Sequence, residues 1–125
     1  MFSHLMIGAN DLEKSKTFYD AVLGALGIRP GRDAQGRVLY AHNNGLLLIT
    51  KPINGEPACH ANGGTIGFAA ATTELVDAFH AAGLANGGTT CENPPGVRDG
   101  GFGKLYLGYL RDPDGNKICA MHRMS

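Results

Sequence analysis

One pattern of apolar residues and turns occurs twice in the chain, and this repeat limits the possible folds more than any other feature. A shift of 61 residues aligns the first half with the second and superposes several identical residues. The superposed residues are Phe18 and Phe79, Ala21 and Ala82, Leu23 and Leu84, and Gly27 and Gly88. A longer loop in the second half raises the shift to 70, which places Ile49 on Cys119. We interpret the repeat as a duplication; the alternative is chance similarity between two ordinary βαββ units.

Each half has the order of a strand, a helix and antiparallel strands. In the first half we predict strands at about 2–9, 37–42 and 46–50, and a helix from Leu12 to Gly27 capped by Asn10. In the second half we predict strands at 65–71, 89–92, 105–111 and 116–122, and a helix after Thr72 or Thr73. Asn44-Gly45 is typical of a two-residue hairpin turn, and Asp112-Pro113-Asp114-Gly115 predicts a second hairpin.

The length of each half predicts how the two are organised. A unit of about 60 residues buries too little surface to be stable alone. The halves therefore share one core, or each pairs with a second chain. We expect a single domain over 1–125, with module one at about 1–52, a linker at about 53–63 that is rich in Pro, Gly and Asn, and module two at about 64–125.

Composition narrows the functional classes. Eleven basic residues balance eleven acidic ones, so there is no positive excess for nucleic acid. No apolar run is long enough to span a membrane, and the first residues lack the pattern of a signal peptide. Three cysteines at no metal-like spacing suit reduced thiols. We expect a cytoplasmic protein that uses neither nucleic acid nor a membrane.

Two segments carry a resemblance to a known family. The first runs from His4 to Tyr19 (HLMIGANDLEKSKTFY) and the second from Tyr109 to Ile118 (YLRDPDGNKI). They resemble the first strand and helix, and the last hairpin, of the vicinal oxygen chelate superfamily, which includes glyoxalase I, bleomycin-resistance proteins, extradiol dioxygenases and fosfomycin-resistance enzymes. The resemblance implies an α+β fold of two repeated βαβββ modules that form a half-open curved sheet around a ligand cavity. Many members of that superfamily are homodimers, so it also implies a homodimer here.

The same resemblance implies where a metal would bind. The family's ligand positions fall on His4, Ile49, Thr65 and Cys119, where glyoxalase-like members carry His or Gln, Glu, His and Glu. Only His4 matches. A catalytic divalent ion needs three or four protein ligands with imidazole or carboxylate donors, and Ile49 and Thr65 supply neither. The resemblance therefore implies a degraded metal site, and we expect no cofactor. The alternative is a divalent metal held by His4, with Cys119 as a second donor.

His4 and Cys119 also have simpler explanations. A histidine on an apolar strand is commonly hydrogen-bonded within the core, and a cysteine inside an apolar strand is commonly a small buried hydrophobe. A nucleophilic Cys119–His4 dyad is a further alternative. We do not assign a catalytic residue from the sequence.

Hairpin register suggests which residues line a cavity. With Asn44-Gly45 as the turn, Tyr40 lies opposite Ile49, and His42 lies on the same face. The second hairpin would set Gly108 opposite Cys119, with Tyr106 on that face. If these faces line the cavity, it is apolar and aromatic with polar tips at Tyr40, His42 and Tyr106, which suits a small flat ligand. The alternative is that both faces are packed core.

One glycine-rich segment adds a cation to the candidate site. Residues 94–104 contain Arg98, which can meet an anionic group in a bidentate way. The segment is either a lid over the ligand or an ordinary surface loop.

The combined prediction is a protein of this superfamily type that binds a small apolar or aromatic molecule in the sheet cavity, with Tyr40, His42, Arg98 and Tyr106 as ligand-binding residues. Two alternatives remain open. One is a metal-dependent lyase or dioxygenase of the glyoxalase or extradiol type. The other is an interaction module without a pocket.

Overall fold

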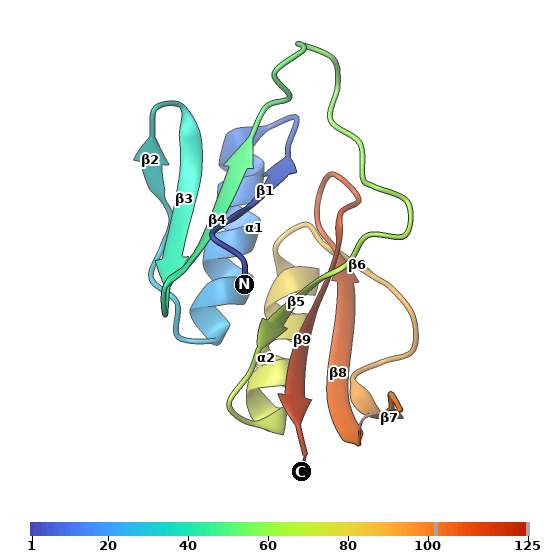
Figure 1. The fold of residues 1–125 in the computed structure, drawn as a ribbon. Helices are drawn as coiled ribbons and strands as arrows, with labels where there is room; N and C mark the ends of the chain where they lie inside the picture. The colour runs from blue at the N-terminus through green and yellow to red at the C-terminus, as the bar shows by residue number, and fades with distance from the viewer. Residues whose placement is uncertain (102, 125) are drawn as a thin grey trace.

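The computed structural model describes residues 1–101 and 103–124. The first half contains, in order, β1 (Leu5–Gly8), α1 (Leu12–Ala25), β2 (Arg32–Ala34), β3 (Arg37–His42) and β4 (Gly45–Thr50). The second half contains β5 (Ile66–Ala69), α2 (Thr73–Ala85), β6 (Thr89–Thr90), β7 (Gly96–Asp99), β8 (Lys104–Arg111) and β9 (Lys117–Arg123). The two helices and two mixed sheets make the α+β architecture that the resemblance implied (Figure 1).

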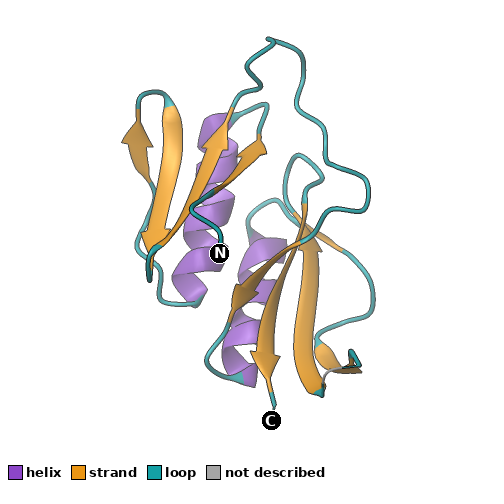
Figure 2. Cartoon of the chain, in the orientation of Figure 1, coloured by secondary structure: helices purple, strands orange, loops and turns teal. Residues whose placement is uncertain are grey.

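Each half forms its own sheet. The first has the order β1-β4-β3-β2 and the second the order β5-β9-β8-β6, with β7 also paired to β8. In both sheets the first strand runs parallel to the last, and the remaining pairs are antiparallel. The long segment between β4 and β5 connects the sheets (Figure 2). The short strands β2 and β7 were not predicted, because three or four residues with mixed polarity carry little periodic signal.

Side-chain caps fix where both helices begin. Asp11, not the predicted Asn10, caps α1: its Oδ1 accepts a hydrogen bond from the Lys14 backbone N–H at 3.1 Å. Thr72 caps α2 in the same way through the Leu75 N–H. Asn10 instead binds the segment between the sheets, since its Oδ1 accepts from the Ala58 N–H at 2.7 Å.

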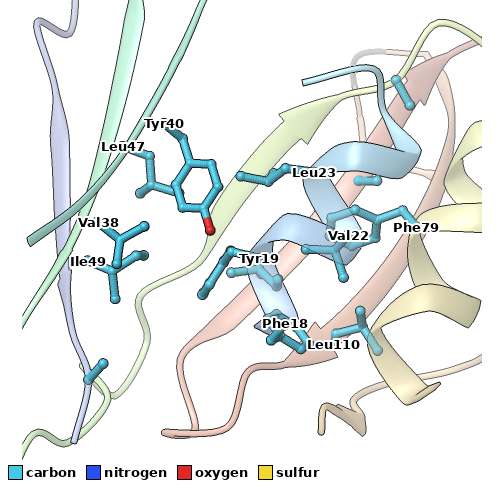
Figure 3. Close-up of a cluster of buried hydrophobic side chains, with 14 of the residues drawn as sticks. Phe18, Tyr19, Val22, Leu23, Val38, Tyr40, Leu47, Ile49, Phe79 and Leu110 are labelled. Atoms are coloured by element: carbon cyan, nitrogen blue, oxygen red, sulfur yellow. The ribbon is translucent and has the colours of Figure 1, made fainter. Parts of the chain in front are cut away.

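A single hydrophobic core joins the two halves. Helix α1 lies between sheet one and α2, and it presents buried side chains in both directions (Figure 3). Tyr19 faces Tyr40 of β3, whereas Phe18 and Val22 point toward Phe79 and Leu110 of the second half. All of them belong to one buried cluster. Of the two arrangements that the sequence left open, the shared core is therefore present within one chain.

Side chains of the β8–β9 turn form hydrogen bonds that join the second half to the first. Asp112 is buried and its Oδ2 accepts a hydrogen bond of 2.6 Å from the Tyr19 hydroxyl of α1. Asn116 donates to the Gly8 carbonyl at the end of β1. Asp114 accepts hydrogen bonds from the Asn10 N–H and from the Ser15 hydroxyl. Burial, and then Asp112, raise the pKa of the Tyr19 hydroxyl, which keeps it protonated as a donor.

Asp20 makes the stability of the first half depend on pH. Burial raises the pKa of Asp20, but hydrogen bonds from Lys16 Nζ, the Gly31 N–H and the Tyr40 hydroxyl outweigh it and lower that pKa. A lowered folded-state pKa stabilises the protein above the ordinary carboxyl pKa of about 4, and this stability is lost as the pH falls through the folded-state value. We expect Asp20→Asn to unfold at lower urea concentration at pH 7 and to match the parent protein near about pH 2. Equal destabilisation at both pH values would contradict the assignment.

Both hairpins differ in register from the prediction. In the first, His42 pairs with Gly45 and Tyr40 with Leu47, rather than Tyr40 with Ile49. The turn residues are Asn43 and Asn44, which have φ of 47° and 66°. Two consecutive left-handed residues form the turn that matches the twist of a hairpin, and asparagine tolerates that conformation well. The register moves by two residues, so the predicted residues still share one face.

In the second hairpin the shift is a single residue. Tyr109, not Gly108, lies opposite Cys119, because five residues separate the paired ends Arg111 and Lys117. Asp112 holds this longer loop by accepting from the backbone N–H of Asp114 and of Asn116, both at 2.9 Å. A shift of one residue moves a side chain to the other face of the sheet. The prediction that Tyr106 shares a face with Cys119 is therefore wrong.

Candidate functional site

Each sheet has one face against a helix and one face without a helix, which we call its open face. In sheet one, Leu47 and Ile49 point to the helix side and are buried, so Met6 and its register partner Leu48 point to the open face. In sheet two, Ile118 and Ala120 pack on the helix side, so Cys119 and its partner Gly67 belong to the open face.

A cleft lies between the two halves, on the helix side of sheet one. Its volume is about 380 Å³. Its apolar lining comes mainly from β1, the end of α1, β4 and β5, and includes Leu5, Leu23, Ile28, Leu46, Leu47 and Phe68. Tyr40 and His42 of β3, both predicted as ligand-binding residues, also line it. The Tyr40 face is thus packed core along most of its length and opens into a cleft at the end that carries His42.

Tyr40 presents only a small part of its ring to this cleft, since the residue is 3% exposed, and it presents no free hydroxyl. The hydroxyl donates to Asp20 Oδ1 at 2.8 Å and also approaches the Lys16 carbonyl at 3.3 Å. Burial, and then the hydrogen bond to Asp20, raise the pKa of Tyr40, so the phenol stays neutral. A rigid neutral aromatic wall suits an apolar ligand.

The structure places the other two predicted ligand residues away from the cleft. Tyr106 lies on the helix side of sheet two, where its hydroxyl donates to Asp77 Oδ1 of α2 at 2.8 Å. The Arg98 guanidinium donates to the carbonyls of Asn93, Pro94 and Gly96 within its own loop. Residues Gly96–Asp99 of that loop form strand β7 and belong to sheet two. Phe102 of the predicted lid lies outside the described residues.

The open face of sheet two carries a charged pair beside an aromatic ring. Lys117 Nζ forms an ion pair with Glu92 and lies 5.0 Å from the centroid of the Tyr109 ring. The hydrogen bond from Lys117 to Glu92 raises the pKa of Lys117, and burial raises the pKa of Tyr109. Neither shift brings these groups toward a pKa near 7, where acid–base catalysis is most efficient.

Comparison with known proteins identifies the family. The family model described as Glyoxalase/Bleomycin resistance protein/Dioxygenase superfamily matches residues 1–120. The chain belongs to this superfamily. A glyoxalase/bleomycin resistance protein from Albidiferax ferrireducens T118 is 67% identical, with a TM-score of 0.96, over 98% of this chain and 99% of that chain.

More distant solved structures share the fold. An integron cassette protein from the mobile metagenome of V. cholerae is 26% identical, with a TM-score of 0.67, over 98% of this chain and 94% of that one. A glyoxalase/bleomycin resistance protein/dioxygenase family enzyme from Burkholderia phytofirmans PsJN is 16% identical, with a TM-score of 0.73, over 98% of both chains.

The structure changes one of the four positions that the resemblance assigned to metal ligands. Ile49 is 1% exposed and packs in the core, on the opposite face of its sheet from the Cys119 position. Met6 pairs with Leu48 just as its repeat partner Gly67 pairs with Cys119. Leu48 is therefore the counterpart of Cys119. Asn43-Asn44 and Asn44-Gly45 both suit a two-residue turn, so the sequence alone did not choose this register.

The residues at these positions do not fit a catalytic divalent metal. Leu48 has no donor atom, and Thr65 has only a neutral hydroxyl. Cys119 would supply a single sulfur donor, which suits soft ions better than the divalent ions of this chemistry. His4 is exposed and its Nδ1 lies 2.8 Å from the Ser3 hydroxyl. Within the part of the chain that the structure describes, no three His, Cys, Asp or Glu residues form a group able to hold a metal ion.

The described chain also contains no helix long and apolar enough to cross a membrane.

Proposed function

We propose that this superfamily protein binds a small neutral aromatic or apolar molecule in the cleft between its two halves, without a metal ion. The observation that carries the proposal is the lining of the cleft. Among the described residues, it combines apolar side chains from both halves with Tyr40, and its other polar side chains are those of His42 and Asn43.

The size and chemistry of the cleft support this class of ligand. Its volume of about 380 Å³ falls in the range of about 300–1,000 Å³ that is usual for small-molecule sites. Such sites are mostly apolar, with a few polar groups that orient the ligand. His42 and Asn43 meet that requirement at one end, and a flat ring would contact the more exposed apolar side chains of the lining, Leu5, Leu46 and Phe68.

The side chains at the family's metal-ligand positions favour ligand binding over metal-assisted catalysis. Of the family ligand positions, Leu48 and Thr65 offer no imidazole or carboxylate, and Cys119 offers a single sulfur donor. We therefore derive no reaction step through a metal. Three free cysteines suit a reducing compartment, and the proposal places the protein in the cytoplasm.

The sheet edges support a homodimer. Within the described residues, β1 and β5 are each paired on one side only, which leaves backbone donors and acceptors at both edges. Exposed Leu5 and Met6 lie on β1. We expect light scattering to give the mass of two chains at micromolar concentration. A monomer at all concentrations would contradict the dimer but not the cleft.

A substitution in the cleft tests ligand binding. We expect Leu46→Glu to weaken binding of the neutral probe 2-naphthol, measured by calorimetry, by about tenfold or more, since burying an unpaired charge beside an apolar ligand is unfavourable. Leu84→Glu is the matched control, because Leu46 and Leu84 are 40% and 43% exposed and only Leu46 lines the cleft. Equal affinity in both variants would contradict the site, as would the failure of the parent protein to bind the probe.

A further inference from the structure

A second hollow lies on the opposite side of sheet one. It has a volume of about 610 Å³. Its floor is formed by the ends of β1 and β4, including Met6, Gly8 and Thr50. The segment that follows β4 supplies most of its wall, including Pro52, Pro57 and Cys59. The hollow is distinct from the cleft, since the two share no lining residue.

Two cations face this hollow, and no acidic residue does. Arg37 of β3 and Lys51 after β4 both line it, whereas Asp and Glu are absent from its lining. Within the described residues, neither the Arg37 guanidinium nor the Lys51 ammonium takes part in a hydrogen bond or an ion pair. The chain as a whole has no net charge, so this positive potential is local.

The wall of the hollow is held in place. Both backbone groups of Ala58 bind Asn10: the N–H donates to Asn10 Oδ1 at 2.7 Å, and the carbonyl accepts from Asn10 Nδ2 at 3.2 Å. Asn10 is fixed in turn by Asp114. A Cβ added at Gly8 would come within 3.1 Å of the Ala58 Cβ, so glycine allows the wall to approach the floor closely. A preformed hollow avoids the entropic cost of ordering a loop on binding.

We propose that this hollow binds a small organic anion, with a carboxylate or phosphate group between Arg37 and Lys51 and an apolar body against Met6 and the proline-rich wall. Arginine forms a planar fork that matches either anionic group, and lysine adds a compact charge. The apolar wall excludes water from one side of the ligand, which strengthens the attraction to both cations. This site extends beyond the proposed function, because its place in the fold and its ligand charge both differ from those of the cleft.

Calorimetry with three probes of one ring system tests the site on the full chain: 2-naphthoate, 2-naphthyl phosphate and neutral 2-naphthamide. We expect at least one anionic probe to bind about tenfold more tightly than the amide. Arg37→Gln and Lys51→Gln should each weaken that binding by about three- to tenfold. Arg32→Gln and Lys14→Gln are the matched controls, because both residues are exposed and lie outside the hollow. The relative affinity of the carboxylate and the phosphate identifies the preferred anionic group.

The alkylation rate of Cys59 is a second measurement of binding in the hollow, and it is independent of the measured affinities. The exposed Cys59 thiol lines the hollow, so a bound anion should slow its alkylation by iodoacetamide about fivefold or more at saturation, while Cys91 keeps its rate. The protection should disappear in the Arg37→Gln, Lys51→Gln double variant.

Three outcomes would overturn the proposal: equal binding of amide and anions, no effect of the two substitutions, or loss of anion binding in Leu46→Glu alone. The last result would place the anion in the cleft. Failure of 2-naphthol to bind would contradict the cleft and leave the second site standing.

Discussion

Replacing Asp112 with alanine should lower the free energy of unfolding by about 3–5 kcal/mol, as measured by urea denaturation. The carboxylate is 4% exposed. It accepts hydrogen bonds from the Tyr19 hydroxyl, from the N–H groups of Asp114 and Asn116, and from Asn116 Nδ2. Its removal leaves the buried Tyr19 hydroxyl and three half-buried donors without this partner. A buried donor without a partner costs about 1–3 kcal/mol. The Tyr19 hydroxyl is the most affected, because burial keeps it from water.

Two further variants separate this role from a general effect of removing an aspartate. Asp33→Ala, at an exposed position on β2, should change the stability by less than about 0.5 kcal/mol. Tyr19→Phe should lose about 1 kcal/mol, the usual contribution of one hydrogen bond. A loss below about 1 kcal/mol in Asp112→Ala would show that the turn holds its shape without the carboxylate.

Phe18→Ala should lower the free energy of unfolding by about 3–5 kcal/mol, because it leaves a cavity where the two halves meet. Phe18 is fully buried, and its ring contacts Tyr19 edge-on with a centroid distance of 4.9 Å. The ring occupies the space left by two glycines of the second half: a Cβ at Gly83 or Gly88 would lie 3.3 Å or 2.6 Å from Phe18 Cε1. Urea denaturation with two optical probes measures the loss.

The shared core also determines the form of the transition. Because the core is continuous, both probes should report a single transition in Phe18→Ala, at a lower urea concentration than in the parent protein. Phe2→Ala is the control, since Phe2 is 73% exposed and should cost little. Two separated transitions, one for each half, would contradict the single core.

The repeat and the helix periodicity predicted the order of the elements in each half, and the family resemblance implied the fold. Neither predicted the register of the hairpins. The prediction assigned the first turn to Asn44-Gly45, but both residues of Asn43-Asn44 adopt the left-handed conformation and move the pairing by two residues. Both dipeptides suit such a turn, so local sequence alone does not choose between them. In the second hairpin Asp112 holds the loop through the N–H groups of Asp114 and Asn116, and the same carboxylate is held by Tyr19, 93 residues away in the chain. A long-range contact of this kind leaves no local signal.

The sequence likewise predicted only part of the candidate site. Tyr40 and His42 were predicted to line a cavity, and the structure places both at the cleft, although their role as ligand-binding residues stays a prediction. Tyr106 faces a helix instead, because a register error of one residue reverses the face. Arg37 and Lys51 were not predicted, since Arg37 begins β3 whereas Lys51 follows β4, and only the pairing of β3 with β4 brings both to one hollow.

Burying α1 between its own sheet and α2 has a consequence for how the protein responds to dilution. A free module of this type would leave one flank of its helix in water and would have to associate with a second copy to cover it, so its folding would depend on concentration. Here the second module is attached to the same chain, and Phe18 and Val22 find their partners at a fixed effective concentration. The core of each chain therefore persists at dilutions that separate the proposed homodimer, and subunit exchange does not require unfolding.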